Sequence, residues 1–374
     1  MGLELKRVAT AKEKNVFIKL PWEIYRNEPC WIPPLLLERK KFLNSKINPF
    51  FKHAEVVYYL AFAENRKPAG RIAFILDHGY NEFHSEKTGL FGLFESIEDQ
   101  RVVDLLLNAV FKECGARGLS RLMGPMNLST NHECGLLVEG FEYPSMLGMP
   151  YNPPYYSNFL EEWGLVKAKD LVSFHIRDFK KIPEYLEGAM VRVRKRKRFS
   201  VRCLRMEQFE KELDILWEVY NSAWIHNWGF VPMTREEFIF ASNEMRLIAD
   251  PAFCLIAEVN GEPVGFSLTL PDINQVLKNM NGRLFPFGWF KFFMGKKKIN
   301  SYRVLTLGVK KKFQRLGIDV HFYYETYKRC VEKKVPLCEM SWILEDNQAM
   351  LVPLHRMDAV IYRRHRIYER PCEN

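Results

Sequence analysis

The residues best suited to bind a ligand lie between Val309 and Gly317, in the stretch VKKKFQRLG. An apolar, strand-like run ends at Val309, and a helical pattern begins after Gly317. Glycine at such a turn lets backbone N–H groups approach an anion closely, and the helix N-terminus adds a positive dipole end. Four cations surround the turn: Lys310, Lys311, Lys312 and Arg315. The pattern predicts a pyrophosphate site, with a solvated lysine run before an ordinary helix as the alternative.

A second group of polar residues lies in the first half, between residues 124 and 156, where the stretches GPMNLSTN and YNPPYY occur. Long structured loops of this composition often line a site, although a rigid loop that only packs the chain has the same composition. Four side chains are therefore named as substrate-contacting candidates: Asn127, Asn152, Tyr155 and Tyr156.

The elements that must position these residues occur twice. Segments 56–77 and 253–271 each show two β-rich runs around a polar turn, which indicates a hairpin. Each hairpin is followed by a strand, an amphipathic helix and another strand, at 89–94, 100–117 and 119–123 and again at 304–309, 316–333 and 337–344. This internal repeat predicts a mixed α/β (α+β) chain of two similar domains, residues 1–178 and 179–374.

The order of hairpin, strand, Val-x-x-x-x-Gln-x-x-Gly turn, helix, strand, Asn and helix resembles the GNAT superfamily of acyl-CoA N-acyltransferases. Val309, Gln314 and Gly317 match the family's turn, whereas Asp319 stands where the family usually has Gly or Ala. The resemblance covers most of residues 205–370. The whole chain also resembles a bacterial group of tandem GNAT-like proteins that carry a GPxNxS and a YNxxYY pattern. The implied architecture is two tandem GNAT-like domains, the second of which binds acyl-CoA.

The resemblance also implies which residues hold the co-substrate, acetyl-CoA or another acyl-CoA. In that family the strand before the turn contacts the pantetheine arm, the turn wraps the pyrophosphate, and an Asn at the next helix faces the coenzyme. The implied positions are Leu307, Gly308, Val309, Gln314, Arg315, Leu316, Gly317, Ile318, Asp319 and Asn347. The implied reaction moves an acyl group, with acetyl as the expectation, to a small-molecule or peptide amine in the cleft between the domains. No metal and no covalent intermediate are expected.

Amine acylation needs a base to take the ammonium proton. Glu339 and Glu345 lie on or just after the strand 337–344. Glu339 is the preferred base, because a carboxylate within a strand is costly unless it faces a cleft, and a salt-bridged glutamate is the alternative.

Two histidines complete the candidates. Leu354 stands where the family has its tyrosine acid, so the adjacent His355 is the candidate proton donor, with a surface histidine as the simpler interpretation. His226 lies between two tryptophans and is a further substrate-side candidate, with an ordinary helix-face residue as the favoured alternative.

The first half carries a different turn at the equivalent place. Residues 95–100, ESIEDQ, hold three carboxylates and no glycine. Like charge repels a pyrophosphate, so the first domain is expected to be a degenerate copy on the substrate side.

Composition supports the division into two domains and excludes several classes of protein. The chain has 374 residues, 47% of them hydrophobic, and a net charge of +10. Residues 1–178 hold 22 basic and 22 acidic side chains, so the whole excess lies in the second half. The eight cysteines show no CxxC spacing, as in reduced, metal-free proteins. Charges near the N-terminus and prolines in the longest uncharged stretch predict neither a signal peptide nor a membrane span, hence a cytoplasmic protein.

Two segments fit no motif. The run VRVRKRKRFSVR at 191–202 is most simply a solvated face, with nucleic acid and an acidic membrane surface as less favoured ligands. The insertion NGRLFPFGWFKFFMGKKK at 281–298 predicts either peripheral membrane contact or a lid over an acyl chain.

Two other functions remain open at this point. The Fem-type aminoacyl-tRNA-dependent transferases are also doubled GNAT-like proteins, and the basic run would then bind RNA. Alternatively, Asp319 and Leu354 mark a non-catalytic module that binds acyl-CoA or lipid.

Overall fold

The chain is divided into two units that do not follow a single break in the sequence. The computed structural model describes residues 2–196, 198–285 and 288–372. Unit 1 comprises Met1–Leu171, Leu277–Lys291 and Arg363–Asn374, and unit 2 comprises Val172–Val276 and Phe292–Tyr362. The division differs from the expected boundary after residue 178, because the last strand of the chain returns to unit 1 and residues 172–178 belong to unit 2.

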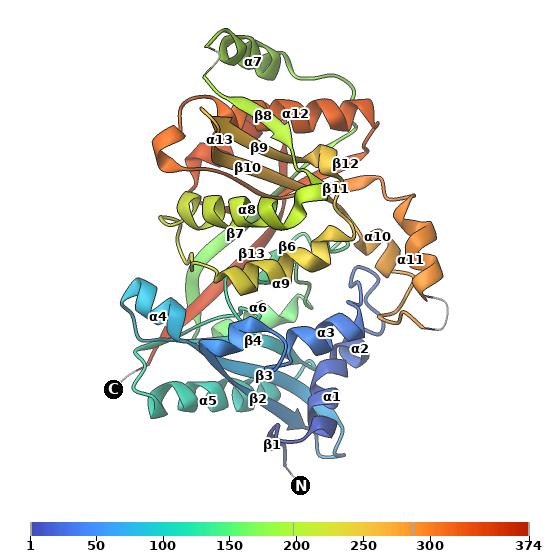
Figure 1. Cartoon of the computed structure of the whole chain (residues 1–374). Helices are drawn as coiled ribbons and strands as arrows, with labels where there is room; N and C mark the ends of the chain where they lie inside the picture. Colours follow the sequence, from blue (N-terminus) through green and yellow to red (C-terminus); the bar gives the residue numbers. More distant parts are fainter. Residues whose placement is uncertain (1, 197, 286–287, 373–374) are drawn as a thin grey trace. The chain divides into compact units, whose positions relative to one another are not determined.

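Unit 1 is built on a sheet with the strand order β1-β2-β3-β4-β5-β13, and β6 also pairs with β13 (Figure 1). Strands β4 and β5 are parallel, and the other neighbours are antiparallel. The hairpin expected over 56–77 is confirmed as β2 and β3. In chain order the elements are β1 (Glu4–Arg7), α1 (Ala11–Lys19), α2 (Pro21–Ile24), α3 (Leu36–Phe42), a 3-10 turn (Pro49–Lys52), β2 (Ala54–Phe62), β3 (Pro68–Asp77), α4 (His78–His84), β4 (Thr88–Ser96), α5 (Gln100–Ala116), β5 (Arg121–Gly124), β6 (Leu136–Glu139) and α6 (Tyr155–Glu162).

Helix α5 forms the main core of unit 1 by packing on β2, β3, β4 and β5. Its apolar positions recur at helical spacing, and Val102, Leu106 and Val110 are completely buried. Gly70 on β3 lets the helix approach, since a Cβ there would lie 2.7 Å from the Leu106 side chain.

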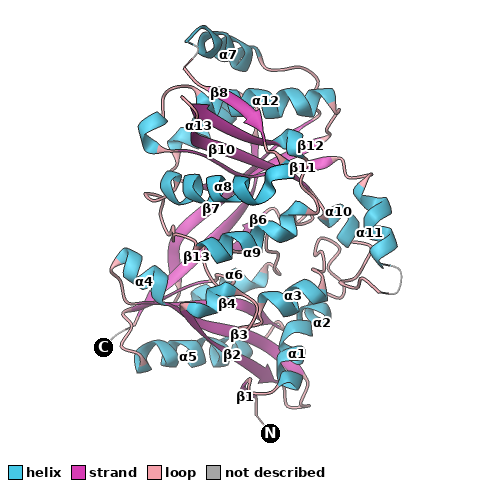
Figure 2. Ribbon diagram, in the orientation of Figure 1, coloured by secondary structure: helices cyan, strands magenta, loops and turns pink. Residues whose placement is uncertain are grey.

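Unit 2 repeats the same order of elements, and its strands follow one another in the order β7-β12-β11-β10-β9-β8 (Figure 2). The expected hairpin over 253–271 is confirmed as β9 and β10, and β11 is parallel to β12. The elements are α7 (Glu184–Arg196), β8 (Ser200–Cys203), α8 (Phe209–Ala223), α9 (Arg235–Arg246), β9 (Cys254–Val259), β10 (Glu262–Pro271), β11 (Ser301–Val309), α12 (Ile318–Glu332), β12 (Leu337–Leu344) and α13 (Gln348–Arg356), with 3-10 turns at Met206–Gln208, Pro251–Phe253 and Lys311–Phe313.

Alternation along β9 explains how this sheet is covered on both faces. Cys254 and Ile256 join the cluster formed with α8, whereas Leu255 and Ala257 join the cluster formed with α12. Successive side chains of a strand point to opposite faces, so one short strand supplies both cores.

Four elements contribute residues to both units. Strand β7 (Val166–Arg177) and strand β13 (Val360–Pro371) each contribute residues to both units. Helices α10 (Asn274–Leu277) and α11 (Gly288–Lys296) are likewise divided. Within the described ranges, no helix is long and apolar enough to cross a membrane. All eight cysteines lie in these ranges and form no disulfide.

Candidate functional site

The candidate site forms where two parallel strands of unit 2 separate. Ser301–Val304 of β11 pairs with Leu337–Met340 of β12, and among the described residues this pairing ends there. Both strands continue, β11 to Val309 and β12 to Leu344. On its other side β11 stays paired with β10. Thr306 is opposite Leu268 and Val304 is opposite Thr269, so Leu305 is an extra residue and forms a bulge. A bulge bends a strand and increases its twist, which turns β11 away from β12.

A cavity of about 600 Å³ occupies this opening and lies entirely in unit 2. Its walls come from both separated strands, from α8, and from α12 and α13. The lining residues on these elements, at their ends or on the neighbouring strand β10 include Trp224, Ser267, Val304, Leu305, Thr306, Leu307, Gly308, Val309, Tyr323, Thr326, Tyr327, Met340, Ser341, Trp342, Ile343, Leu344, Asn347 and Leu354. Gly308 allows the close approach of α8, since a Cβ there would lie 2.2 Å from the indole ring of Trp224.

One end of the cavity is the glycine turn that precedes α12. Gln314, Arg315, Ile318 and Asp319 line it. Gly317 is the N-cap of α12 with φ of 87°, a conformation that glycine adopts without strain, and no side chain caps the helix there. The first backbone N–H groups of an α-helix have no partner within the helix, so this end is suited to an anion.

Several cations stand near the turn, and they are not equivalent. Lys310 is 2.6 Å from Glu218 and 3.5 Å from Glu262, so its charge is already balanced. Lys311, Lys312 and Arg315 are exposed. The carboxylate of Asp319, half-buried in the first turn of α12, opposes them.

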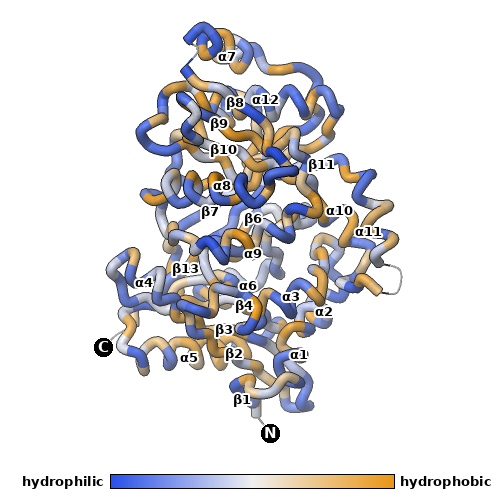
Figure 3. Tube along the Cα trace, viewed as in Figure 1, coloured by the Kyte–Doolittle hydropathy of each residue, from blue (hydrophilic) through white to orange (hydrophobic). Residues whose placement is uncertain are grey.

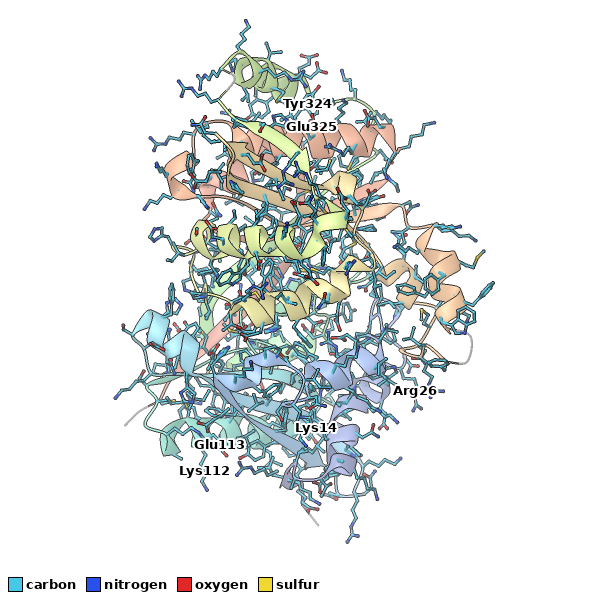
Figure 4. All side chains as sticks on the ribbon, viewed as in Figure 1. Lys14, Arg26, Lys112, Glu113, Tyr324 and Glu325 are labelled. Carbon is cyan, nitrogen blue, oxygen red and sulfur yellow. The ribbon has the colours of Figure 1, made fainter. Side chains whose placement is uncertain are left out.

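The basic run of the second half also reaches this turn through α7. A Cβ on Gly317 would lie 2.5 Å from the side chain of Val193, and the Arg194 guanidinium lies 5.1 Å from the centre of the Tyr324 ring on α12 (Figure 4). Arg192, Lys195, Arg196 and Arg198 are exposed. Lys197 lies outside the described residues. At the other end of the run, Arg202 forms ion pairs with Glu212 and Glu258, both at 2.7 Å.

Two polar atoms in the cavity wall have no hydrogen-bond partner among the described residues. They are Ser267 Oγ on β10 and Trp342 Nε1 on β12, and both atoms are buried. A buried polar group without a partner costs free energy, so such atoms indicate where a polar ligand group would be bound.

Glu339, the preferred base, is fully buried beside the cavity and is not one of its lining residues. Its carboxylate accepts hydrogen bonds from the hydroxyls of Ser341 and Tyr362, and it lies 3.5 Å from Arg303 Nε. Arg303 also donates to Ser341 Oγ at 2.9 Å. Ser341 lines the cavity, and it therefore connects the buried ion pair to the cavity wall.

The other residues predicted for unit 2 fall into two groups. Asn347 lines the cavity next to the start of α13. Glu345, His355, His226 and Leu316 do not line it, although Leu344, Leu354 and Asn227 beside three of them do. His355 is exposed and packs edge-on against Phe174, and His226 is exposed.

In unit 1 the equivalent opening is filled by the chain itself. β4 and β5 pair over Thr88–Leu90 and Arg121–Met123, and the next residue, Phe91, accepts a hydrogen bond at 2.7 Å from Met126 N. A Cβ on Gly92 would lie 1.7 Å from the Met126 carbonyl oxygen. The loop after β5 therefore packs directly onto β4, where unit 2 has its cavity.

The four substrate candidates of unit 1 all hold backbone groups in place. Asn127 Oδ1 accepts from Leu93 N at 2.7 Å, and Asn152 Oδ1 accepts from Leu137 N at 2.7 Å. The hydroxyls of Tyr155 and Tyr156 both donate to Ser96 O, at 2.8 and 3.1 Å. None of the four lines the cavity of unit 2.

The carboxylates of the turn in unit 1 are also engaged. Glu95 is buried against the hydroxyls of Tyr25 and Tyr156 and lies 3.3 Å from Arg71. Burial raises the pKa of Glu95 although these partners oppose the shift. Asp99 caps α5 by accepting from Arg101 N at 3.0 Å. This helix end is therefore capped by a carboxylate, whereas α12 begins with an uncapped glycine.

Sequence reasoning did not single out Ser267, Trp342 or Arg303. The signal for Ser267 is a hydroxyl within the apolar strand run GFSLTL, but Thr269 carries the same signal and does not line the cavity. The signal for Arg303 is also ambiguous, because a lone arginine in an apolar strand is as compatible with an exposed position at a sheet edge as with a buried one beside a site.

Comparison with solved structures identifies the class of fold. A tandem GNAT protein from the clavulanic acid biosynthesis pathway covers 100% of this chain and 99% of its own length, with a TM-score of 0.57 and 11% identity. A GCN5-related N-acetyltransferase from Sphaerobacter thermophilus matches with a TM-score of 0.51 over 100% of this chain and 96% of its own, at 12% identity. The expected fold of two tandem GNAT-like domains in a mixed α/β chain is thus confirmed.

Two curated proteins then define the family. Protein YghO of Escherichia coli (strain K12) is 35% identical over 375 residues, which cover 97% of this chain and 95% of that protein. Bacterial ceramide synthase of Caulobacter vibrioides (strain NA1000 / CB15N) is 35% identical over 372 residues, covering 97% and 96%. This chain belongs to the same family as these two proteins. No family model matches it.

Proposed function

We propose that this chain is an N-acyltransferase that moves an acyl group from an acyl-CoA to the nitrogen of an amine. The observation that carries the proposal is the opening between β11 and β12, because its cavity runs from the separated strands to the glycine turn before α12. A thioester arm can lie in such an opening while its phosphates stay at the helix N-terminus.

The residues present fit a coenzyme A thioester. We retain the ten predicted contacts as part of the proposal, eight of which line the cavity: Leu307, Gly308, Val309, Gln314, Arg315, Ile318, Asp319 and Asn347. The unpartnered Ser267 Oγ and Trp342 Nε1 would hydrogen-bond the amide groups of the pantetheine arm. Leu316 and Gly317 would serve through their backbone at the turn.

The basic run has a role in this proposal. Since Val193 packs on Gly317, the exposed cations of α7 lie on the helix that covers the phosphate turn. Their positive charge would attract the phosphates of the coenzyme and would offset the carboxylate of Asp319.

The chemistry requires one new bond and one broken bond. The amine nitrogen attacks the thioester carbonyl carbon, the C–N bond forms and the C–S bond breaks. The sulfur leaves as a thiolate, which takes up a proton from solvent water to give the coenzyme thiol. The proton lost by the amine passes to Ser341 Oγ, which hands its own proton to Glu339 Oε1. Glu339 is then a positioning residue that acts through Ser341, with Arg303 balancing its charge.

The name of one relative suggests the acceptor. A ceramide is the fatty amide of a long-chain amino alcohol, and the Caulobacter relative is called a ceramide synthase. We therefore propose a long-chain amine as the acceptor and a fatty acyl-CoA as the donor, in preference to acetyl-CoA. The largely apolar side chains of the cavity wall, such as Leu305, Trp342 and Leu354, are compatible with a fatty chain.

Calorimetry with the full chain tests the donor half of the proposal. Acetyl-CoA, palmitoyl-CoA and free coenzyme A are titrated into the protein, and one binding site per chain is expected, since the opening of unit 1 is filled. Gly317→Ala should weaken binding at least about tenfold, because its Cβ would collide with Val193 and its φ of 87° is strained for alanine. Gly261→Ala is the matched control: φ there is 82°, and its Cβ would meet open space.

Release of coenzyme thiol on addition of an amine tests the acceptor half. Long-chain amino alcohols should support turnover, and Ser341→Ala should lower kcat by about 10²-fold while leaving acyl-CoA affinity unchanged. Tight binding without turnover for any amine would favour the non-catalytic module. Salt-sensitive binding of tRNA in place of acyl-CoA would favour the aminoacyl-tRNA-dependent transferase.

A further inference from the structure

Helix α11 presents an apolar face outward because two glycines form its inner face. Gly288 and Gly295 are seven residues apart, so they lie on the same side of the helix. A Cβ on Gly288 would lie 2.2 Å from the carbonyl oxygen of Arg283, and a Cβ on Gly295 would lie 2.8 Å from Val276. The two glycines thereby seat the helix closely, and the larger side chains must point the other way.

Four large apolar side chains occupy that outer face. Trp289 is 51% exposed, Phe290 55%, Phe293 64% and Met294 51%. Their spacing of one, four and five residues keeps them within one side of the helix. In Figure 3, the trace of α11 alternates between orange hydrophobic and blue hydrophilic residues. An exposed cluster of this kind on one short helix indicates a surface that is covered by something else.

The charges around the helix define what could cover it. Residues 278–298 contain six cations and no carboxylate: Lys278, Arg283, Lys291, Lys296, Lys297 and Lys298. All six are exposed. Pro286 and Phe287, the latter named among the aromatic residues of this insertion, lie outside the described residues. Aromatic side chains flanked by lysines, without acids, match the interface of an anionic lipid bilayer, where rings enter the headgroup region and cations meet lipid phosphates.

We propose that α11 and its flanking lysines dock the protein onto anionic membrane surfaces, with the helix lying in the plane of the interface. Trp289, Phe290 and Phe293 insert among the headgroups, and Lys297 and Lys298 contact lipid phosphates. A protein partner with an apolar groove would need carboxylates to meet six cations, whereas an anionic bilayer supplies both properties in one surface. The inference does not rest on the acyltransferase proposal.

Vesicle flotation tests it. The full chain is mixed with vesicles of phosphatidylcholine alone or of phosphatidylcholine with phosphatidylglycerol, and co-flotation is expected with the anionic vesicles. The triple variant Trp289→Ser, Phe290→Ser, Phe293→Ser should lose at least about tenfold in partitioning. The double variant Lys297→Glu, Lys298→Glu should lose the preference for anionic vesicles, and added salt should weaken binding of the parent chain.

A matched control removes the same number of exposed apolar side chains elsewhere. The variant Leu37→Ser, Ile47→Ser, Val166→Ser changes residues that are 54%, 49% and 57% exposed, and it should float like the parent chain. Equal flotation of the α11 triple variant and the parent would overturn the proposal. So would a change of oligomeric state in that variant without a change in flotation, which would make the face a contact between copies. Loss of acyl-CoA binding in solution with unchanged flotation would instead make α11 a lid.

Discussion

At the residue scale, Ser267 and Thr269 carry the same chemical group in different settings. Both hydroxyls are buried on β10 and have no partner among the described residues, but only Ser267 lines the cavity. A buried hydroxyl without a partner destabilises the folded state unless a ligand satisfies it. If acyl-CoA occupies the cavity, Ser267 is therefore expected to contact it, whereas Thr269 is not.

Ser267→Ala should weaken acyl-CoA binding about 3- to 10-fold while leaving the free protein as stable or more stable, because an unsatisfied polar group is removed. Thr269→Val should have the same effect on stability and none on binding. Calorimetry and thermal unfolding of both variants provide the check. Equal affinities in the two variants would mean that Ser267 does not contact the ligand.

Lys14 gives a prediction about pH. Its ammonium group lies 2.9 Å from the centre of the Tyr58 ring, and burial lowers the pKa of Lys14 to about 7 from an ordinary 10.5 (Figure 4). Below pH 7 the group is charged in both the folded and the unfolded state, so the folded state bears the full cost of burying it. Stability should therefore rise as the pH increases from 7 to 10.5, where the group becomes neutral in both states.

Lys14→Met should accordingly raise the free energy of unfolding by roughly 1–3 kcal/mol at pH 6, an amount reduced by the lost contact with the Tyr58 ring. The gain should shrink toward zero near pH 10.5. Urea unfolding at several pH values measures it, with the exposed Lys12→Met on the same helix as the reference. A loss of stability at pH 6 would mean that the ring contact outweighs desolvation.

At the element scale, two copies of the same strand-turn-helix unit differ in the segment after the strand. β11 leads into an uncapped glycine turn with an open cavity beside it, whereas β4 leads into a helix capped by Asp99, with the Met126 loop against the strand. We therefore expect unit 1 to bind no phosphate for two reasons. Carboxylates at its turn repel an anion, and the loop that contains Met126 fills the opening.

Helix α7 belongs to this scale because it packs along α12 through Val193 and Arg194. Arg192→Glu combined with Arg196→Glu should reduce acyl-CoA affinity by roughly tenfold at low salt and by less at high salt, since the interaction is between solvent-exposed charges. Lys40→Glu with Lys41→Glu on α3 makes the same charge change elsewhere and should leave affinity unaltered. Equal losses of acyl-CoA affinity in both double variants would mean that only the net charge of the protein matters, and not the position of the cations on α7.

At the scale of the whole molecule, the last residues of the chain complete the first unit. Tyr368–Pro371 of β13 pairs with Gly124–Arg121 of β5, and Arg366 pairs with Asp170 at 2.9 Å. The Arg363 side chain is fully buried and donates to the carbonyls of Tyr143 and Pro144. Unit 1 therefore cannot reach its native packing until the C-terminal strand has been made.

Tyr368→Ala tests this dependence, because Tyr368 is completely buried in the core of unit 1 and donates to Glu161 at 2.9 Å. Its loss should cost about 3–5 kcal/mol. Hydrogen exchange should rise in β4 and β5 of unit 1, while β9 and β10 of unit 2 stay protected and acyl-CoA affinity changes little. Uniform loss of protection in both units would show that they unfold as one.

The sequence alone determined the repeated order of elements, the two hairpins and the glycine turn. These features are local: an alternation of period two, a helical period and a glycine before a helix are set by neighbouring residues. The resemblance to GNAT proteins came from the same short-range order. This explains why Val309, Gln314 and Gly317 were recognised and why eight of the ten coenzyme candidates line one cavity.

Only the tertiary structure decided the surroundings of those residues. Glu339 meets Arg303, 36 positions earlier, and Tyr362, 23 positions later, and its burial depends on those distant partners. Asn127 and Asn152 hold backbone groups, although their loops have the composition of a binding site. The exchange of strands between the units was equally hidden, because pairing between segments hundreds of residues apart depends on packing that no local pattern records.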